Sequence, residues 1–242
     1  MNTIYGKEFA TVYSRNWASF SQRIWPFLKR TTTGINTRDS SWLDLCCGTG
    51  SLLSMVSDAG FRAVGVDISS HQLKYAKKNT PLAILLKQDI RKLDLPEKFD
   101  VITCLYDSLN YLTTKEELSI VFKRLKKHLA PGGVFVFDVN THEGFARYWN
   151  RVWTVRDGQE LVILEGSFDA KRAIGKTVIT GFIPDGNFYK KFEEVHIQRG
   201  YRASEVEKLL ARAGFAFRKY DGKQFGRAKK LSGRLVYVSR IK

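Results

Sequence analysis

Cysteine and histidine are both scarce in this chain. Its 242 residues include three cysteines and four histidines, and none of them forms a CxxC pair or another ligand spacing typical of metal sites. Cys46 and Cys47 are adjacent and Cys104 stands alone, so the pattern does not indicate a disulfide framework. We therefore expect a reducing, cytoplasmic environment, no bound metal, and thiols that act as small buried hydrophobic groups.

Long hydrophobic runs are missing as well. No stretch approaches the ~18 consecutive apolar residues of a membrane span, and the opening residues, MNTIYGKEFATVY, lack the apolar core of a signal peptide. We expect neither a leader segment nor a membrane partner. The hydrophobic fraction of 43% is ordinary for a soluble globular protein, and the length suits one α/β domain with some accessory structure.

Charge is the unusual global property of the chain. The formal net charge is +16, and the segment from Arg199 to Lys242 holds 13 Lys and Arg against three Asp and Glu. Such a segment can attract nucleic acid or another anionic partner. No basic run exceeds two residues, which favours a solvated basic surface over a nucleic-acid site. The pattern does not indicate an oligomeric state.

The first thirty residues carry apolar side chains at steps of three and four, from Tyr5 to Leu28. This spacing predicts one or two amphipathic helices. We interpret residues 1–30 as a helical lid ahead of the main domain, because the following residues, 31–40, are polar and predict a loop.

Short apolar runs alternate with helical patterns between residues 31 and 143. Continuous apolar strands separated by helices indicate a parallel sheet that is covered on both faces. Thr114 and Glu117 have the spacing of a capping box at the start of one helix. The expected strands are Trp42–Cys47, Ala63–Val66, Leu82–Lys87, Asp100–Leu105 and Val134–Val139, and the expected helices are Ser51–Ala59, Ser70–Asn79 and one that ends at Leu129.

The pattern changes between residues 144 and 200. Four strand-like runs there are separated by turn signals such as Arg156-Asp-Gly158, which predicts an insert of antiparallel strands. Residues 201–242 contain a helix, opened by a second capping box at Ser204 and Glu207, and two closing strands. The whole pattern predicts an α/β, Rossmann-like, doubly wound sheet of seven strands with an antiparallel last strand, a helical lid and a β insert after the fifth strand.

A glycine turn follows the first strand, in the sequence Asp44-Leu-Cys-Cys-Gly48-Thr-Gly50. Glycine lets the backbone turn tightly and approach a ligand, and ligands bind at the carboxyl ends of the strands in such sheets. A dinucleotide fingerprint needs a third glycine, where this chain has Leu53. Because Asp44 would repel a phosphate, the turn suits a cationic cofactor.

Two further acids end the second and third strands. Asp67 comes 23 residues after Asp44 and can accept hydrogen bonds from ribose hydroxyls, and Asp89 can accept one from an adenine amino group. With the apolar Ile68 beside them, these residues describe a pocket for a nucleoside without phosphate, such as S-adenosylmethionine (SAM). The competing interpretation is that Asp44 caps a turn and that the other two acids cap helices.

On these residues the chain resembles the class I SAM-dependent methyltransferases, over roughly residues 40–140 and 200–242. The turn from Asp44 to Gly50 is similar to the family's first motif, often written DLGCGTG, with Cys46 where a glycine is familiar. The resemblance implies that Gly48 and Gly50 line the methionine part of SAM, that Asp67 binds the ribose, that Ile68 packs on the adenine and that Asp89 meets its amino group. The other candidate cofactor-binding residues are Asp44, Cys46, Ile90 and Tyr106.

The segment after the fourth strand lacks the motifs of nucleic-acid methylases. An Asn/Asp-Pro-Pro-aromatic motif and a Pro-Cys nucleophile are both absent, which argues against methylation of bases. The DSLNYL stretch from Asp107 to Leu112 instead resembles a bacterial-type subgroup of small-molecule methyltransferases. The E-x-H-x-Q-R-x-Y stretch from Glu194 to Tyr201 is similar to the same subgroup. That resemblance implies that the inserted strands roof the acceptor site.

His196 is the candidate general base. On an alternating strand it shares a face with Glu194, whose carboxylate would raise the basicity of the imidazole. The competing interpretation is a polar outer face of the insert. Tyr13 and Asp107 are the other catalytic candidates, and Asp107 suits a helix N-cap equally well. The candidate substrate-binding residues are Asn110, Tyr111, Glu194 and Arg199.

Aromatic side chains around this segment can stack over a sulfonium by cation–π attraction. The helical spacing of the N-terminal ones is equally typical of a stripe that packs on a core. The aromatic candidates are Tyr5, Tyr13, Trp17, Tyr106 and Tyr111.

These patterns together predict an enzyme that transfers a methyl group from SAM to a nitrogen or oxygen of a small metabolite. The protein would contribute alignment and water exclusion, and a base where the acceptor must lose a proton. Two alternatives stay open at this point. One is an RNA methyltransferase that uses the basic C-terminal surface, and the other is a non-catalytic module that only binds SAM.

Overall fold

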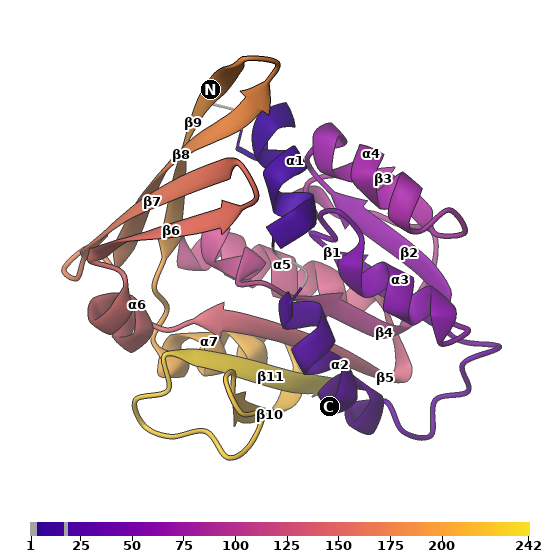
Figure 1. Cartoon of the computed structure of the whole chain (residues 1–242). Helices are drawn as coiled ribbons and strands as arrows, with labels where there is room; N and C mark the ends of the chain where they lie inside the picture. The colour runs from indigo at the N-terminus through magenta and orange to yellow at the C-terminus, as the bar shows by residue number, and fades with distance from the viewer. Residues whose placement is uncertain (1–3, 17–18) are drawn as a thin grey trace.

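Two β-sheets with helices packed against them make up the structure, a computed structural model that describes residues 4–16 and 19–242 (Figure 1). A seven-stranded sheet forms the body of the molecule, and a separate four-stranded sheet stands at its upper left in this view. One aromatic candidate, Trp17, lies outside the described residues.

The large sheet has the strand order β10-β11-β5-β4-β1-β2-β3. Neighbours pair in parallel from β5 to β3, and β11 runs antiparallel to both β5 and β10. This confirms the predicted doubly wound sheet with an antiparallel last strand. The strands are β1 Ser41–Leu45, β2 Arg62–Asp67, β3 Ile84–Lys87, β4 Phe99–Cys104, β5 Leu129–Asn140, β10 Phe215–Asp221 and β11 Arg234–Ile241.

Strand β1 explains why the sequence has continuous apolar runs. All five of its residues are buried. Trp42 belongs to the hydrophobic cluster on one face of the sheet, and Leu43 and Leu45 belong to the cluster on the other. Helices α2 and α3 contribute to the first cluster, and α5 and α7 to the second. The helix bounds are α2 Ser19–Thr31, α3 Ser51–Asp58, α4 Ser70–Asn79, α5 Lys115–His128 and α7 Ala203–Arg212.

The smaller sheet is the predicted antiparallel insert, and its four strands pair in chain order. Helix α1 packs against it, because Phe9 and Val12 share a hydrophobic cluster with Val162, Leu164 and Ile179. The N-terminal pattern therefore forms two helices with different partners, one on each sheet. The bounds are α1 Lys7–Asn16, β6 Arg151–Asp157, β7 Glu160–Asp169, β8 Ile174–Asp185 and β9 Phe188–Arg199.

Three local elements differ from the prediction. A short helix, α6 (His142–Tyr148), joins the two sheets where the insert was expected to begin, and two 3-10 turns, η1 (Ile90–Lys92) and η2 (Ser108–Tyr111), follow β3 and β4. None of these has enough residues to show a hydrophobic period.

The second predicted capping box is wrong. Helix α7 begins at Ala203, two residues earlier than an N-cap at Ser204 would give, and the backbone N–H of Arg202 donates to Glu205 Oε2 at 2.9 Å. The Thr114–Glu117 capping box is confirmed, with both of its hydrogen bonds present. Among the described residues, no helix has the length and apolar character needed to cross a membrane.

Candidate functional site

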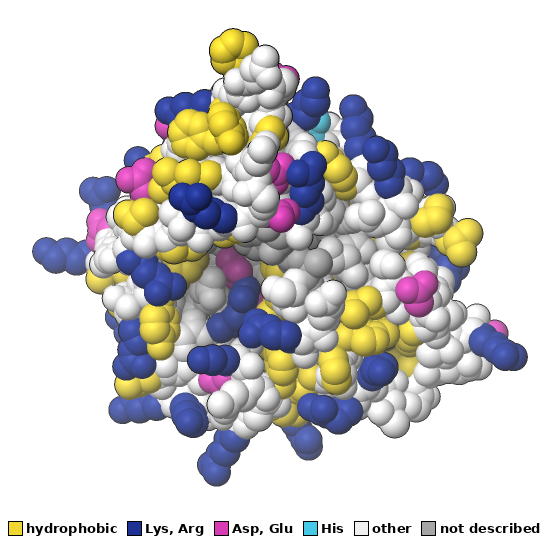
Figure 2. Space-filling view, in the orientation of Figure 1, with side chains coloured by type: hydrophobic (Ala, Val, Ile, Leu, Met, Phe, Trp, Pro, Cys, Tyr) yellow, Lys and Arg dark blue, Asp and Glu magenta, His cyan; other side chains and the backbone are white. Residues whose placement is uncertain are grey.

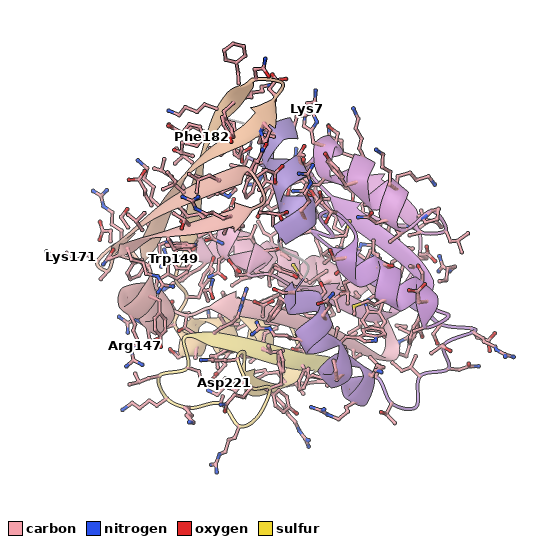
Figure 3. All side chains as sticks on the ribbon, in the orientation of Figure 1. Lys7, Arg147, Trp149, Lys171, Phe182 and Asp221 are labelled. Carbon is pink, nitrogen blue, oxygen red and sulfur yellow. The ribbon has the colours of Figure 1, made fainter. Side chains whose placement is uncertain are left out.

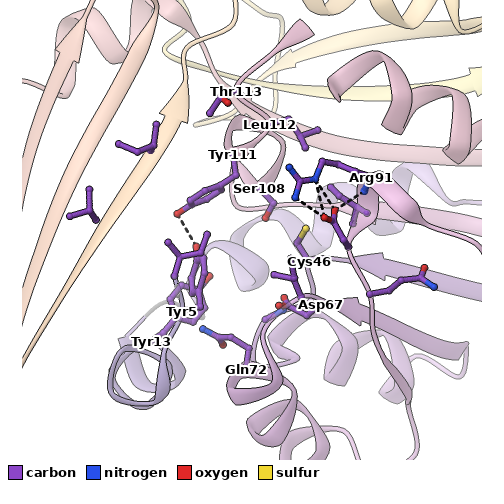
Figure 4. A pocket seen from close by; sticks show the side chains of 18 residues that line it. Tyr5, Tyr13, Cys46, Asp67, Gln72, Arg91, Ser108, Tyr111, Leu112 and Thr113 are labelled. Atoms are coloured by element: carbon purple, nitrogen blue, oxygen red, sulfur yellow. Dashed lines mark hydrogen bonds and ion pairs between the residues drawn. The ribbon is translucent and has the colours of Figure 1, made fainter. Parts of the chain in front are cut away.

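A cavity of about 450 Å³ opens at the carboxyl ends of β1, β2 and β4 (Figure 4). The strand order reverses between β1 and β4, which is the point where ligands bind in open α/β sheets. The cavity is lined from the glycine turn, from the ends of β2, β3 and β4, from the N-terminal segment and from strand β9 of the insert. Elements distant in sequence therefore meet at one site.

The glycine turn takes the backbone conformation that its sequence suggests. Gly48 and Gly50 have φ values of 55° and 81°, in the left-handed region. A Cβ on Gly50 would also come within 3.2 Å of the Ala76 Cα in helix α4. Cys46 has a φ of 54°, at the position where the family motif has glycine, and it carries the strain that a side chain has in this region.

Asp67 fastens the glycine turn to the end of β2. Its Oδ2 accepts the N–H of Gly48 and its Oδ1 accepts the N–H of Ser69, both at 2.8 Å. Burial raises the pKa of Asp67, and these backbone donors partly oppose the increase. Each oxygen keeps a second lone pair. Ser69, not Asp67, caps helix α4, so the interpretation of Asp67 as a helix cap is wrong.

Apolar side chains also line the cavity, among them Ile68 and Ile90. Ile68 is 53% exposed and lines the cavity, so its apolar side chain is accessible to a ligand there. Asp89 lies at the rim, where it caps η1 and pairs with the Arg91 guanidinium at 2.7 Å. Burial tends to raise the pKa of Asp89, but the hydrogen bonds from Arg91 outweigh it and the net shift is downward.

Asp44 lies in a narrow extension of the cavity. The extension shares Tyr13, Cys46 and Gly48 with the main cavity and is also lined by Tyr106. Asp44 Oδ1 accepts the Thr103 hydroxyl at 2.7 Å. Burial raises the pKa of Asp44 to about 7, although this hydrogen bond opposes the increase.

Gln72 is a cavity residue that sequence reasoning missed. It is 1% exposed, and neither of its side-chain polar atoms has a hydrogen-bond partner within residues 4–16 and 19–242. A buried amide without partners is costly, and its place in the cavity wall beside Gly48 suits a polar ligand. The spacing Ser69-x-x-Gln72 is the sequence signal that could have placed Gln72 in the first turn of α4.

Strand β9 directs its polar side chains inward. Glu194, His196 and Gln198 are all buried, whereas Ile197 is 39% exposed. The interpretation of these residues as a polar outer face is therefore wrong. The reason is tertiary: Val195 and Ile197 line the cavity mouth, and the polar side chains meet partners from the N-terminal segment and the β4 end.

A hydrogen-bonded chain runs from Glu194 to the cavity wall. His196 Nε2 lies 2.9 Å from Glu194 Oε2, and His196 Nδ1 lies 2.6 Å from the Tyr111 hydroxyl. With Nε2–H donating to the Glu194 carboxylate, which only accepts hydrogen bonds, Nδ1 is the ring atom that faces the Tyr111 hydroxyl. Tyr5 contacts the Tyr111 hydroxyl at 3.1 Å (Figure 4). Burial raises the pKa of Tyr111, which keeps its hydroxyl protonated.

Tyr5 also ties the N-terminal segment to both sheets. Glu194 accepts the backbone N–H groups of Tyr5 and Gly6, at 2.8 and 2.7 Å. The Ser69 hydroxyl donates to the Tyr5 carbonyl at 2.8 Å. Tyr13, further along in α1, packs edge-on against Tyr5 with the ring centroids 5.7 Å apart, and it lines the cavity.

Asp107 belongs to a buried charge cluster at the ends of β4 and β5. One of its oxygens accepts from Gln198 at 2.7 Å and the other pairs with the Arg234 guanidinium. Arg234 Nε also donates to Asp138 Oδ2 at 2.6 Å. Burial raises the pKa of Asp107 and raises that of Asp138 to about 6, while Arg234 opposes both shifts. Sequence reasoning missed Arg234, which lies 127 residues from Asp107.

Three other candidates have their polar groups engaged elsewhere. The Asn110 amide bonds to the backbone of Asn140 and Arg199 at 2.6 to 2.9 Å, and Arg199 stacks over the Tyr201 ring. The structure places neither Asn110 nor Arg199 on the cavity wall. The Tyr106 hydroxyl accepts the N–H of Ser21 at 3.0 Å.

Comparison with known proteins places this arrangement in a family. A family model described as a methyltransferase domain matches residues 43–133. A curated dTDP-3-amino-3,4,6-trideoxy-alpha-D-glucopyranose N,N-dimethyltransferase from Streptomyces venezuelae is 30% identical over 190 residues, which cover 78% of this chain and 80% of the relative. This chain belongs to the class I SAM-dependent methyltransferases.

Solved structures of other methyltransferases share the fold. The crystal structure of a SAM-dependent methyltransferase from Clostridium acetobutylicum superposes with a TM-score of 0.82 at 29% identity, covering 97% of this chain and 98% of the other. A SAM-bound amino pentose methyltransferase from Micromonospora echinaspora superposes with a TM-score of 0.72 at 23% identity, covering 99% and 98%. The present chain, as a member of this family, has SAM as its cofactor.

Proposed function

We propose that this methyltransferase moves the methyl group of SAM to a nitrogen or oxygen of a small-molecule acceptor, and that an amine nitrogen is its preferred target. The observation that carries the proposal is the Glu194–His196–Tyr111 chain, which ends on the wall of the cofactor cavity. A chain of this kind can take a proton from an acceptor. The Streptomyces venezuelae relative, an N,N-dimethyltransferase by name, supports the preference for an amine.

The cavity residues suit SAM part by part. Asp67 keeps free lone pairs for the ribose hydroxyls, and Ile68 and Ile90 offer apolar surface to the adenine, with Asp89 at its edge. Cys46 and Gly48, which line the main cavity, would contact the methionine part, with Asp44 behind them in the narrow extension. Tyr13 and Tyr106 would face the sulfonium by cation–π attraction. Residues 4–16 would then act as a lid, because Tyr5 is held from both sheets.

The protein's own chemistry is proton transfer and alignment. The acceptor nitrogen attacks the methyl carbon as the carbon–sulfur bond breaks, and its N–H proton must leave. Tyr111 would accept that proton as its own hydroxyl proton passes to His196 Nδ1, and Glu194 would stabilise the resulting imidazolium. The negative charge of Asp107, which interacts electrostatically with His196, would stabilise the same imidazolium.

Formation of S-adenosylhomocysteine tests the proposed function. The full chain, incubated with SAM labelled in the methyl group, should release S-adenosylhomocysteine in the presence of amino sugars linked to dTDP or of a metabolite extract. Mass spectrometry should find the label on an acceptor nitrogen. A chain that binds SAM but releases no S-adenosylhomocysteine with any extract would be a binding module, and the proposal would be wrong.

Gln72→Met is expected to have opposite effects on the free protein and on SAM binding. It removes two unpaired buried polar atoms, so the ligand-free protein should become more stable by about 1 kcal/mol. It also removes the side-chain amide that would hydrogen-bond to SAM, so the affinity for SAM should fall about tenfold. Thermal unfolding and titration calorimetry measure the two effects. The matched control is Gln22→Met, at an exposed position of α2, which should change neither. Equal SAM affinity in Gln72→Met would contradict a contact.

SAM affinity is expected to rise between pH 6 and pH 8. Asp44 has a pKa of about 7 in the folded protein, so it gains its negative charge across this range and then attracts the cationic cofactor. The stability of the ligand-free protein has the opposite sign, because a raised carboxyl pKa favours the folded state at low pH and that contribution is lost as pH rises from about 4 to 7. Calorimetry at several pH values measures the affinity, and Asp44→Asn should flatten the dependence.

A further inference from the structure

A second cavity, of about 550 Å³, lies between helix α6 and the β10–β11 connection, below the antiparallel sheet. Arg147, Trp149 and Asp221 mark its surroundings in Figure 3. No role in SAM binding uses this cavity, since it shares no lining residue with the cofactor cavity or with its narrow extension.

The cavity is cationic. Arg147, Lys223 and Lys229 line it, and none of the three pairs with an acid within residues 4–16 and 19–242. The one acid in its lining, Asp221, already accepts three hydrogen bonds, from the Ser232 hydroxyl and from the backbone N–H groups of Lys223 and Gln224. Dark blue side chains gather along the lower part of the molecule in Figure 2. Such a cavity attracts an anion.

One wall of the cavity is formed by Arg234, a member of the buried charge cluster with Asp107 and Asp138. Arg234 lines the cavity, and its guanidinium holds Asp107. Asp107 in turn accepts from Gln198, two residues along β9 from His196. The cavity therefore adjoins the buried cluster that Gln198 links to strand β9.

The cavity also offers a flat apolar surface. The Tyr148 ring is 48% exposed, and the Arg147 guanidinium lies 5.9 Å from its centroid. An exposed ring beside cations suits a group that has a planar base as well as phosphate. Inorganic phosphate alone would leave this ring unused.

We propose that this cavity binds the nucleoside diphosphate end of the acceptor, with the phosphates on Lys223, Lys229 and Arg147 and the base on Tyr148. The proposal rests on the proposed function and specifies its acceptor as a nucleotide-linked small molecule. The basic C-terminal segment then has a defined role, because its loop residues hold the anionic end of the substrate.

Titration calorimetry of the full chain with thymidine 5′-diphosphate tests the proposal. Binding should occur, and Lys223→Gln and Lys229→Gln should each weaken it about tenfold, because each removes a charged partner of the phosphates. The matched control is Lys123→Gln, at an exposed position of α5, which should leave binding unchanged. Tyr148→Leu should weaken thymidine 5′-diphosphate severalfold and leave inorganic pyrophosphate unchanged. SAM affinity in each sample reports that the variant is folded.

Three results would overturn the proposal. One is absence of thymidine 5′-diphosphate binding in a chain that binds SAM. The second is equal affinity for pyrophosphate and the nucleotide, since the site would then recognise phosphate alone. The third is binding of a short single-stranded RNA, but not of the nucleotide, that the same lysine variants weaken and salt abolishes. Failure to bind SAM would contradict the proposed function instead, so the two failures are distinguishable.

Discussion

Replacing Asp67 with alanine is expected to weaken SAM binding by roughly 100-fold or more. The variant would lose the two charge-assisted hydrogen bonds that the carboxylate would accept from the ribose hydroxyls. It would also stop holding Gly48 and Ser69, whose N–H groups the carboxylate now accepts, so the glycine turn would lose the group that fixes its position. Titration calorimetry with SAM measures the effect.

The control for Asp67→Ala is Asp58→Ala, which removes an exposed carboxylate from the end of α3 and should leave SAM affinity unchanged. Because loosening of the turn can also lower stability, the thermal midpoint of each variant is compared without ligand. An Asp67→Ala protein that is folded and binds SAM like the wild type would show that this carboxylate does not hold the ribose.

Replacing His196 with alanine is expected to lower turnover by about 100-fold to 1000-fold and to change the dissociation constant of SAM by less than about twofold. His196 does not line the cofactor cavity and would act through Tyr111, whose hydroxyl it contacts. Removal of the ring leaves the Tyr111 hydroxyl without its proton acceptor. The rate of S-adenosylhomocysteine formation at saturating SAM and acceptor measures the effect.

Tyr111→Phe should resemble His196→Ala, and the double variant should be little slower than either, because residues that act as one unit are not additive. A structural role alone would lower stability without changing the pH dependence of turnover. The fall in turnover toward acid pH, where a required base is protonated, should therefore disappear in His196→Ala. The matched control is His71→Ala, at a half-buried position of α4 outside the cavity wall. Wild-type turnover in His196→Ala would remove the ring from the mechanism.

The large sheet could be predicted from the sequence because its signals are local. Five apolar runs, helices with clear periodicity and a glycine turn between Asp44 and Gly50 define the order of elements, and one rule then places ligands at the carboxyl strand ends. Asp67 and Ile68 follow from that rule, and the cavity contains both.

Contacts between distant segments could not be predicted in the same way. Asn110 is polar and follows β4, so a substrate contact was reasonable, yet its amide holds the backbone at Asn140 and Arg199. In the sequence Arg234 is one basic residue among many, and only the pairing of β11 with β5 brings it to Asp138. Alternation gives two faces for β9 but does not say which one is inside.

The backbone contacts of Tyr5 bear on when cofactor and product can leave the enzyme. The Tyr5 backbone is held by Ser69, which also contacts Asp67, and by Glu194, which also contacts His196. Spent cofactor and methylated product would thus leave through the same opening movement. The rate of opening of the proposed lid would then be an upper limit on turnover for every acceptor, whatever the intrinsic reactivity of the amine.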